Sequence, residues 1–230
     1  FLKNKKYRII GFSFKSKKLG NIKIPKNIKI YSSWRKMVLD KNIDAIAIAV
    51  PPSLHKSIIS LAVKKNKHIF CEKPFTLSYK EANYICKLLK KNKKISHMVN
   101  YEFADIGAFA YFKKKIINNI KINKIHLSWF INSKKRSGVN WKENHSRGGG
   151  IIFNYICHSI YYLEYLFGKI DSVQTNIIFK KSNGVNTLSG IFFFKNGLST
   201  KLDIKIGSIN KNIKPIHQLK IFSKKNNYIL

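Results

Sequence analysis

The N-terminal hundred residues alternate between short apolar runs and helical patterns. Residues 44–50, Asp-Ala-Ile-Ala-Ile-Ala-Val, have the composition of a buried strand, and the segment that starts at Pro51-Pro52 begins a helix extending to about Lys65. Residues 66–74 contain the next apolar strand, which ends on Glu72-Lys73-Pro74. Strand, helix and strand in this order form half of a doubly wound fold, which binds ligands at the carboxyl ends of its strands. The pattern therefore predicts a ligand crevice at Pro51, Pro52 and Lys73.

Local signals at helix ends support this interpretation. Ser32 or Ser33 can cap a short helix, and Ser78 with Glu81 three positions later has the spacing of a capping box. Asn66 tolerates the left-handed conformation that helix ends often adopt. The additional elements expected here are strands at Tyr7–Phe14 and Lys94–Glu102, and helices at Trp34–Leu39 and Ser78–Lys91.

After about residue 103 the pattern changes to strands with apolar–polar alternation and hairpin turns such as Asn196-Gly197. The expected strands are Ile125–Asn132, Ser172–Lys180, Thr187–Phe194, Leu198–Ile206 and Gln218–Phe222, with a helix at Ile151–Phe167. We therefore predict an α/β protein. Residues 1–102 form a partial Rossmann-like, doubly wound parallel sheet, and residues 103–230 form an α+β domain with a large, mostly antiparallel open sheet. The apolar end at Tyr228-Ile-Leu230 predicts that this second domain is incomplete.

The charge narrows the possible partners. A formal net charge of +35 comes from 41 lysines and four arginines against ten acidic residues. Proteins that read phosphates or bases use arginine generously, because its planar fork binds them through two hydrogen bonds. Scattered lysines favour a solvated surface, and we expect no specific nucleic acid partner.

Three cysteines without C-x-x-C spacing favour reduced thiols in a cytoplasmic protein, with neither a disulfide framework nor a zinc site. No apolar run approaches the roughly 18 residues of a membrane span. No set of His, Cys and Asp residues has the spacing of metal ligands.

Two motifs resemble the Gfo/Idh/MocA family of NAD(P)-dependent oxidoreductases. The family pattern runs approximately I-D-A-V-x-I-x-T-P-P-x-x-x-H, and residues 43–55 resemble it with one residue fewer between the prolines and the histidine; G-K-H-V-x-x-E-K-P corresponds to residues 66–74. A later Gly-Gly-Gly at 148–150 is followed by His158 in a helix and by Gly168 at its end. The motifs have the family's order and lie on the expected secondary structure. The resemblance implies a Rossmann domain followed by a substrate-binding and dimerisation domain.

The chain departs from the family in three places. The glycine-rich G-x-G-x-x-G loop is absent, and Gly11 alone does not replace it, so we expect the first βα unit to lie before Phe1. Phe14 stands where the family has a ribose-binding acid, and Lys15 after it would favour the 2′-phosphate of NADP over NAD. Asn154 and Tyr161, four before and three after His158, replace acidic residues that the family often has.

The resemblance also implies roles for individual residues. Lys73 stabilises negative charge on the reacting oxygen, and His158 exchanges its proton; these are the expected catalytic residues. The expected cofactor-binding residues are Pro51, Pro52, His55, Glu72, Lys73 and Lys15, and the expected substrate-binding residues are Tyr101, Trp141, Lys142 and Asn154. A structural reading stays open for several of them: His55 can simply pack or cap its helix, and Glu72 can be a surface carboxylate.

These residues predict an oxidoreductase that moves hydride between NAD or NADP and a hydroxyl carbon of a sugar, nucleotide sugar or cyclitol. The expected partners are a carbohydrate-type substrate and further copies of the chain, in a dimer or tetramer. The alternative is a non-catalytic relative that binds a nucleotide or sugar as a sensor, which the missing glycines, Phe14 and Asn154 favour. A nucleic-acid-binding protein is favoured by charge alone.

Overall fold

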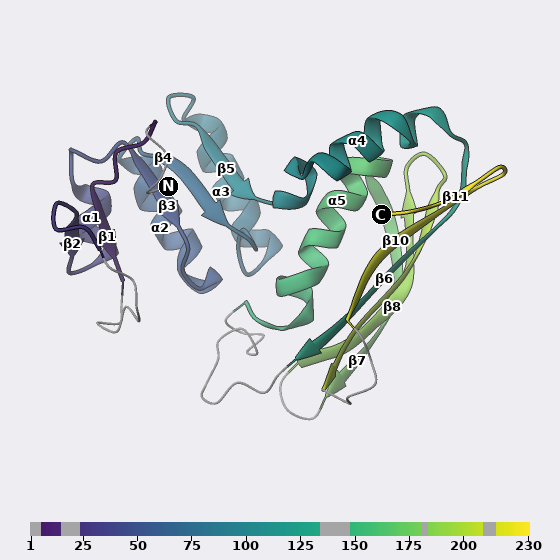
Figure 1. The fold of residues 1–230 in the computed structure, drawn as a ribbon. Coiled ribbons are helices and arrows are strands. Elements are labelled where there is room, and N and C mark those ends of the chain that lie inside the picture. Colours follow the sequence, from purple (N-terminus) through teal and green to yellow (C-terminus); the bar gives the residue numbers. More distant parts are fainter. Residues whose placement is uncertain (1–5, 15–23, 134–147, 181–183, 209–214) are drawn as a thin grey trace. The chain divides into compact units, whose positions relative to one another are not determined.

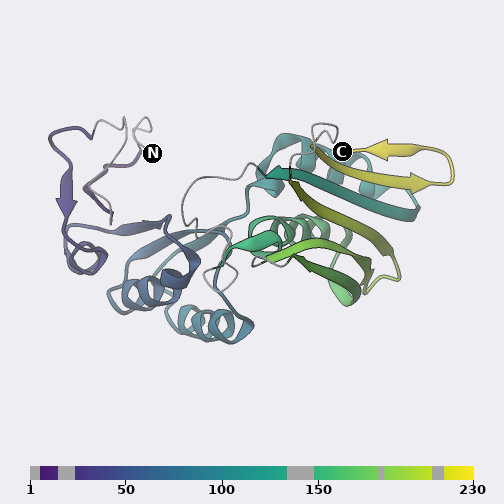
Figure 2. The ribbon, with the colours of Figure 1, turned by 90° about the horizontal axis from the view of Figure 1, so that it is seen from below.

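The computed structural model describes residues 6–14, 24–133, 148–180, 184–208 and 215–230. The chain divides into two compact units, Phe1–Asn100 and Tyr101–Leu230. The sequence placed the change of pattern after residue 102, and the contacts divide the chain after Asn100. The first unit has parallel strands and the second a large, mostly antiparallel sheet, which confirms the predicted fold class (Figures 1 and 2).

Parallel strands form the core of the first unit. The strands β3 (Ala45–Ile48), β4 (His68–Glu72) and β5 (His97–Asn100) pair in that order and in parallel. β1 (Gly11–Ser13) pairs in parallel with β2 (Lys29–Tyr31), a strand that the sequence did not predict, in a sheet of its own. The doubly wound fold has the strand order 3-2-1-4-5-6, numbered along a complete chain. In that scheme β1 and β2 correspond to positions 2 and 3, and β3, β4 and β5 correspond to positions 4, 5 and 6. No strand within the described residues occupies position 1.

The helices of this unit begin and end where the sequence signals indicated. α1 (Trp34–Leu39) has Ser33 as its cap, whose Oγ accepts a hydrogen bond from the Lys36 amide at 3.3 Å. α2 spans His55–Lys64 after a 3₁₀ turn at Pro52–Leu54, and Asn66 follows it with φ of 53°. α3 (Tyr79–Lys91) is capped by Ser78, whose Oγ accepts from the Glu81 amide at 3.3 Å.

One face of the three-stranded sheet carries the apolar core. Ile46 and Ile48 of β3 are buried against the helices, whereas Ala45 and Ala47 on the opposite face are exposed. The prediction of a buried strand at residues 44–50 was therefore wrong on one face. The physical reason is that side chains alternate across a strand and the helices' apolar residues pack on one side.

A buried lysine links the start of β4 to the preceding loop. Lys67 is 8% exposed, and its Nζ donates hydrogen bonds to the carbonyl oxygens of Asp40 (2.9 Å) and Ile43. A buried ammonium group is costly unless its protons are bonded. Lys67 therefore differs from the chain's solvated lysines, because it satisfies two carbonyl oxygens before β3.

The second unit contains a six-stranded sheet in the order β11-β10-β6-β9-β8-β7. Its strands are β6 (Ile122–Ser133), β7 (Ile170–Lys180), β8 (Gly184–Phe194), β9 (Ser199–Ser208), β10 (Ile216–Ser223) and β11 (Asn227–Ile229). All neighbouring strands are antiparallel except β6 and β9, which pair in parallel. The turn between β8 and β9 uses Gly197 with φ of 84°, a conformation that glycine adopts without strain.

Helices cover one face of this sheet (Figure 1). α5 (Cys157–Phe167) buries Tyr162, Leu163 and Leu166 against Leu127 of β6 and its neighbours. Ile152–Ile156 before it is a π-helical turn, so the predicted helix at 151–167 is not regular throughout. α4 (Gly107–Lys115), which the sequence analysis did not predict, adds Phe109 and Phe112 to the same core.

We predict that Lys67→Met destabilises the first unit by about 1–3 kcal/mol, because it leaves two carbonyl oxygens without their donor. Urea denaturation of the variant and the parent protein measures this difference. Lys65→Met is the matched control: Lys65 is exposed two residues earlier, and its loss should change stability by less than about 0.5 kcal/mol. Equal effects of the two substitutions would contradict a structural role for Lys67.

Candidate functional site

The carboxyl ends of β3, β4 and β5 bring the first group of candidate residues to one edge of the sheet. Because the strands are parallel and adjacent, the turn at Pro51-Pro52, the Glu72-Lys73 pair and Asn100 follow or end three neighbouring strands. Lys73 and Glu72 are half-buried, and Pro52 is buried. The structure thus brings together the candidates that the sequence placed after these strands, which is where doubly wound sheets bind ligands.

Glu72 has a fixed orientation at this edge. Its Oε1 accepts a hydrogen bond of 2.8 Å from Nδ2 of Asn100, the residue that faces it across the β4–β5 pair. The following Lys73–Pro74 peptide bond is cis. Glu72 is therefore held from the neighbouring strand, and Asn100 is a site residue that sequence reasoning missed. Its only signal was its position at the end of a predicted strand.

His55 lies in the first turn of α2 and is fully buried. Its Nε2 is 2.9 Å from the carbonyl oxygen of Val50, and its Nδ1 is 3.2 Å from that of Phe75 and 3.3 Å from Sγ of Cys71. The ring therefore contacts backbone and thiol atoms of the first unit on both sides. His55 therefore bonds to the turns that follow β3 and β4. These bonds account for its burial without a direct contact to a cofactor.

Cys71 is the thiol closest in sequence to Glu72 and Lys73. It is completely buried, and burial, with a smaller contribution from the Glu72 charge, raises the pKa of its thiol to about 12. A thiol with this pKa stays protonated near neutral pH, and the thiolate is the reactive form. Cys71 is thus a packing residue and hydrogen-bond partner, not a nucleophile.

Gly11 does not serve the function of a glycine-rich phosphate loop. A Cβ atom at this position would lie 2.5 Å from the Lys29 carbonyl oxygen and 2.5 Å from the Tyr31 ring. Glycine is required for close packing of β1 on β2. Gly11 is the only glycine within the described part of the first unit, so that part offers no such loop for a pyrophosphate.

In the second unit, the candidate histidine lies in an aromatic cluster. His158 is in the first turn of α5 and is 5% exposed. Its ring lies edge-on to Phe103 at 5.1 Å and to Tyr101 at 6.1 Å between centroids, and Trp129 of β6 is at 6.5 Å. Tyr101, an expected substrate residue, thus contacts the expected catalytic residue of the same unit.

At two positions near His158 the resemblance implies acidic residues where this chain has Asn154 and Tyr161, and the structure distinguishes the two. The ring of Tyr161 stacks on Tyr101 with a centroid distance of 4.6 Å and an interplanar angle of 12°. Asn154 lies in the π-helical turn, where hydrogen bonds span five residues rather than four. The α-helical spacing that placed Asn154 on the same face as His158 therefore does not hold through this turn.

His217 of β10 is a second histidine in this cluster, and sequence reasoning missed it. Its ring stacks on Trp129 at 3.8 Å, and its Nε2 is 3.0 Å from the hydroxyl of the buried Tyr162. Although the residue as a whole is exposed, desolvation of the ring between these neighbours lowers the pKa of His217 to about 4. His217 and Trp129 meet because they oppose each other in the β10–β6 register, for which the sequence contains no local signal.

Three expected site residues, Lys15, Trp141 and Lys142, lie outside the described residues. Within the described ranges, no group of three His, Cys, Asp or Glu residues is arranged to hold a metal ion. The same ranges contain no helix of the length and apolarity that a membrane span requires.

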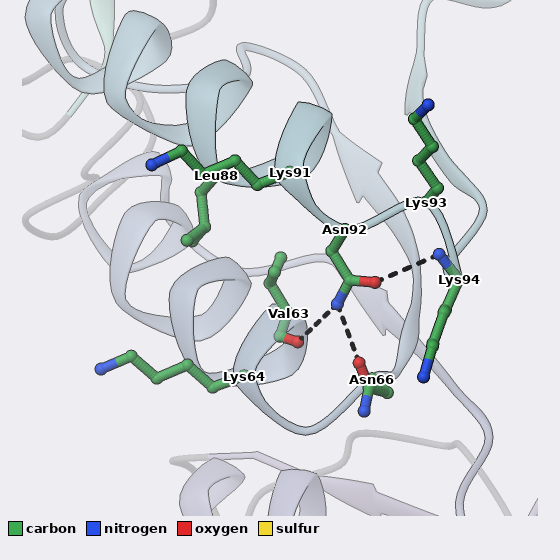
Figure 3. Close-up of a pocket in the computed structure, with 8 residues that line it drawn as sticks. All are labelled: Val63, Lys64, Asn66, Leu88, Lys91, Asn92, Lys93 and Lys94. Atoms are coloured by element: carbon green, nitrogen blue, oxygen red, sulfur yellow. Dashed lines mark hydrogen bonds between the residues drawn. The ribbon is translucent and has the colours of Figure 1, made fainter.

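A groove in the first unit lies away from the strand-end residues. Its volume is about 610 Å³, and Figure 3 shows the side chains that line it at the C-terminal ends of α2 and α3. Asn92 there donates to Asn66 (2.8 Å) and to the Val63 carbonyl (3.2 Å). These helix ends lead into the amino ends of β4 and β5, so the groove is at the opposite edge from Glu72 and Lys73. The lining residues are Val63, Lys64, Asn66, Leu88, Lys91, Asn92, Lys93 and Lys94.

Comparison with known families confirms the resemblance in both units. Residues 6–101 match the sequence model of an oxidoreductase family with an NAD-binding Rossmann fold. Residues 114–217 match the GFO/IDH/MocA C-terminal domain. The two matches follow the order of the two units and together cover most of the chain, which also confirms a nicotinamide dinucleotide as the family's cofactor.

Two curated proteins show the range of relatives. Over 66% of its length, the chain is 31% identical to an uncharacterized oxidoreductase of Schizosaccharomyces pombe, of which the match covers 41%. Over 62% of its length, it is 30% identical to levoglucosan dehydrogenase of Pseudarthrobacter phenanthrenivorans, of which the match covers 38%. The chain spans about two fifths of the length of the curated relatives it matches.

Solved structures share the fold. A levoglucosan dehydrogenase structure in its apo form has a TM-score of 0.78 at 20% identity, covering 87% of this chain and 58% of that one. Its complex with NADH and levoglucosan has a TM-score of 0.75, also at 20% identity, covering 87% and 57%. At this identity the likeness establishes the architecture.

We predict that His217 makes the protein's stability depend on pH. Its folded-state pKa of about 4 lies below the unfolded value of about 6.5, so only the unfolded chain gains a proton as the pH falls between these values. The free energy of unfolding should therefore fall from about pH 6.5 to pH 4, and His217→Phe, which preserves a ring against Trp129, should weaken this fall.

Denaturant titrations at several pH values measure the effect. His97→Phe, at an exposed histidine of β5, is the control and should retain the pH dependence of the parent protein. If the stability difference between His217→Phe and the parent is the same at pH 7 and pH 4, the desolvated His217 ring does not cause the dependence.

Proposed function

We propose a function on one premise: this chain belongs to the Gfo/Idh/MocA family of oxidoreductases. The protein moves hydride between a nicotinamide cofactor and a hydroxyl-bearing carbon of a sugar, nucleotide sugar or cyclitol. The observation that carries the proposal is the position of Lys73. It is half-buried beside an anchored Glu72, at the edge where three parallel strands end.

The first unit contributes charge stabilisation. The Lys73 ammonium stabilises the negative charge that develops on the substrate oxygen, which is the effect expected of a preorganised cation in a partly dehydrated position. Glu72, fixed by Asn100, keeps a carboxylate next to this ammonium and orients the residues at the strand end. Most lysines in the described part of the chain are exposed, so Lys73 is distinguished by its position and not by its residue type.

The second unit contributes proton transfer. His158 is buried among Tyr101, Phe103 and Trp129, and an imidazole exchanges protons near neutral pH. Its ring accepts the hydroxyl proton when the substrate is oxidised and returns it in the reverse direction. His217 is less suited to this role, because desolvation of its ring lowers its pKa to about 4.

The strand-end edge of the first unit fits a dinucleotide. Pro51, Pro52, Glu72 and Lys73 would hold it, in a part of the fold where such ligands bind, and Lys15 would meet a 2′-phosphate if the cofactor is NADP. The bound nicotinamide supplies the hydride acceptor or donor. The buried His55 bonds to the turns that carry these residues. A glycine-rich loop for the pyrophosphate is not among the described residues.

Aromatic rings favour a carbohydrate-type substrate. Tyr101 and Trp129 lie close to His158, and binding pockets commonly combine aromatic walls with a few polar groups that fix orientation. A relative that is 30% identical is named levoglucosan dehydrogenase, a name consistent with this substrate class. Asn154, Trp141 and Lys142 remain our proposed additional substrate residues.

We also propose that the protein assembles with copies of itself through the sheet of its second unit. Ile178 and Ile191 lie on the face of β7 and β8 opposite to Leu188 and Phe192, which pack in the core, and they are 56% and 39% exposed. Exposed isoleucines on a sheet face favour burial against a second apolar surface.

We predict that Lys73→Met lowers kcat by about 10²–10³-fold, the usual cost of removing one group that stabilises an oxyanion. The assay follows NADH or NADPH absorbance with a panel of sugars, nucleotide sugars and cyclitols. Lys80→Met, at an exposed lysine of α3, is the matched control and should retain full turnover. Turnover within a few-fold of the parent in a folded Lys73→Met variant would exclude the proposed role.

A further inference from the structure

The ring of His55 joins two turns that are distant in sequence. One partner is the carbonyl oxygen of Val50, in the turn after β3, at 2.9 Å from Nε2. On the other side, Nδ1 is 3.2 Å from the carbonyl oxygen of Phe75 and 3.3 Å from Sγ of Cys71. Phe75 lies two residues after Lys73 and Cys71 two residues before it, so both partners of Nδ1 flank Lys73.

The bridge can form in two protonation states of the ring. In the neutral form with its proton on Nε2, the ring donates to Val50, and Nδ1 can accept the thiol proton of Cys71, whose Sγ also lies 3.3 Å from the carbonyl oxygen of Glu72. In the doubly protonated form, Nε2 donates to Val50 and Nδ1 donates to Phe75. Cys71 keeps its thiol proton at neutral pH, since its pKa is raised to about 12. In either form one bond reaches the turn after β3 and the other reaches the segment around Lys73.

The contacts are not those of a helix cap. The N-cap of α2 is Leu54, which makes no side-chain hydrogen bond to the helix, and both nitrogens of His55 face atoms outside α2. A packing residue would require only apolar neighbours, whereas a fully buried imidazole with both nitrogens bonded is constrained in direction as well as in volume.

We propose that His55 is a positioning residue, which holds the Lys73 segment against the turn at Pro51-Pro52 without touching substrate or cofactor. The expected effect of His55 on catalysis rests on the proposed function, which gives Lys73 its role in the reaction. The mechanical link itself is a property of the first unit. Loss of the ring would free the Lys73 segment while leaving the helices and strands around it in place.

Hydrogen exchange followed by mass spectrometry tests this link in the free protein. In His55→Phe, which retains a ring but no donor, the amides of residues 75–77 should exchange about tenfold faster, the equivalent of one lost hydrogen bond. Peptides from α3, such as residues 82–91, should exchange at the parent rate. Unchanged exchange at 75–77, or an equal acceleration in α3, would overturn the proposal.

His68→Phe is the matched control, because His68 lies at the opposite end of β4. Its Nδ1 accepts from the Ser96 amide at 2.9 Å, far along the strand from Lys73. Exchange at residues 75–77 should stay at the parent rate in this variant. If His55→Phe does not fold, His55→Gln replaces it, since its amide can donate to Val50. It should accelerate exchange several-fold at 75–77 only, and exchange at the parent rate there would overturn the proposal.

A double-mutant cycle separates positioning from general destabilisation. His55→Phe should lower kcat by about tenfold in the parent protein and by less than about twofold in the Lys73→Met background, because its effect acts through Lys73. Equal losses in both backgrounds would overturn the positioning role. If the parent protein turns over none of the panel compounds, the proposed function fails, and the exchange experiment still decides whether His55 holds the segment.

Discussion

The register of β3, β4 and β5 is the constraint on which the candidate site of the first unit depends. Ile48 opposes Cys71, and Glu72 opposes Asn100. Side chains alternate across a strand, so a slip of one residue in β4 would turn Glu72 into the apolar core and Cys71 out of it. Burial of Ile46, Ile69 and Cys71 against the helices opposes this slip. The same apolar contacts that stabilise the sheet therefore place the carboxylate and the lysine at its edge.

Much of the first unit could be predicted because its signals are local. Ser33, Ser78 and Asn66 mark helix ends through interactions within a few residues, and the structure has each of them in the expected conformation. The parallel pairing of β6 with β9 and the stack of His217 on Trp129 join residues far apart in the chain. Both depend on which strands pair and in which register. A single sequence shows the apolar–polar alternation of a strand, but it does not show which strand lies beside it.

Lysine shows how environment divides one residue type into different roles. Lys67 and Lys73 lie at opposite ends of β4, six positions apart. The first is buried and satisfies two carbonyl oxygens, and the second is half-buried beside a carboxylate at the proposed ligand-binding edge. With a net charge of +35, neither position stands out by composition. The motif around residues 66–74 indicated Lys73, and the backbone contacts of Lys67 required the structure.

Histidine shows the same division more sharply, and here the sequence was least able to separate the roles. His55 bonds the backbone on both sides, His158 lies among aromatic rings, and His217 is kept neutral by desolvation. Position in a helix or strand does not predict these differences, because each depends on atoms brought from other elements. A group that transfers protons must be able to change its protonation state without breaking the structure around it. The bonds of His55 change partners when Nδ1 gains or loses its proton, and desolvation lowers the pKa of the His217 ring. Of these three histidines, His158 is therefore the one that we propose for proton exchange.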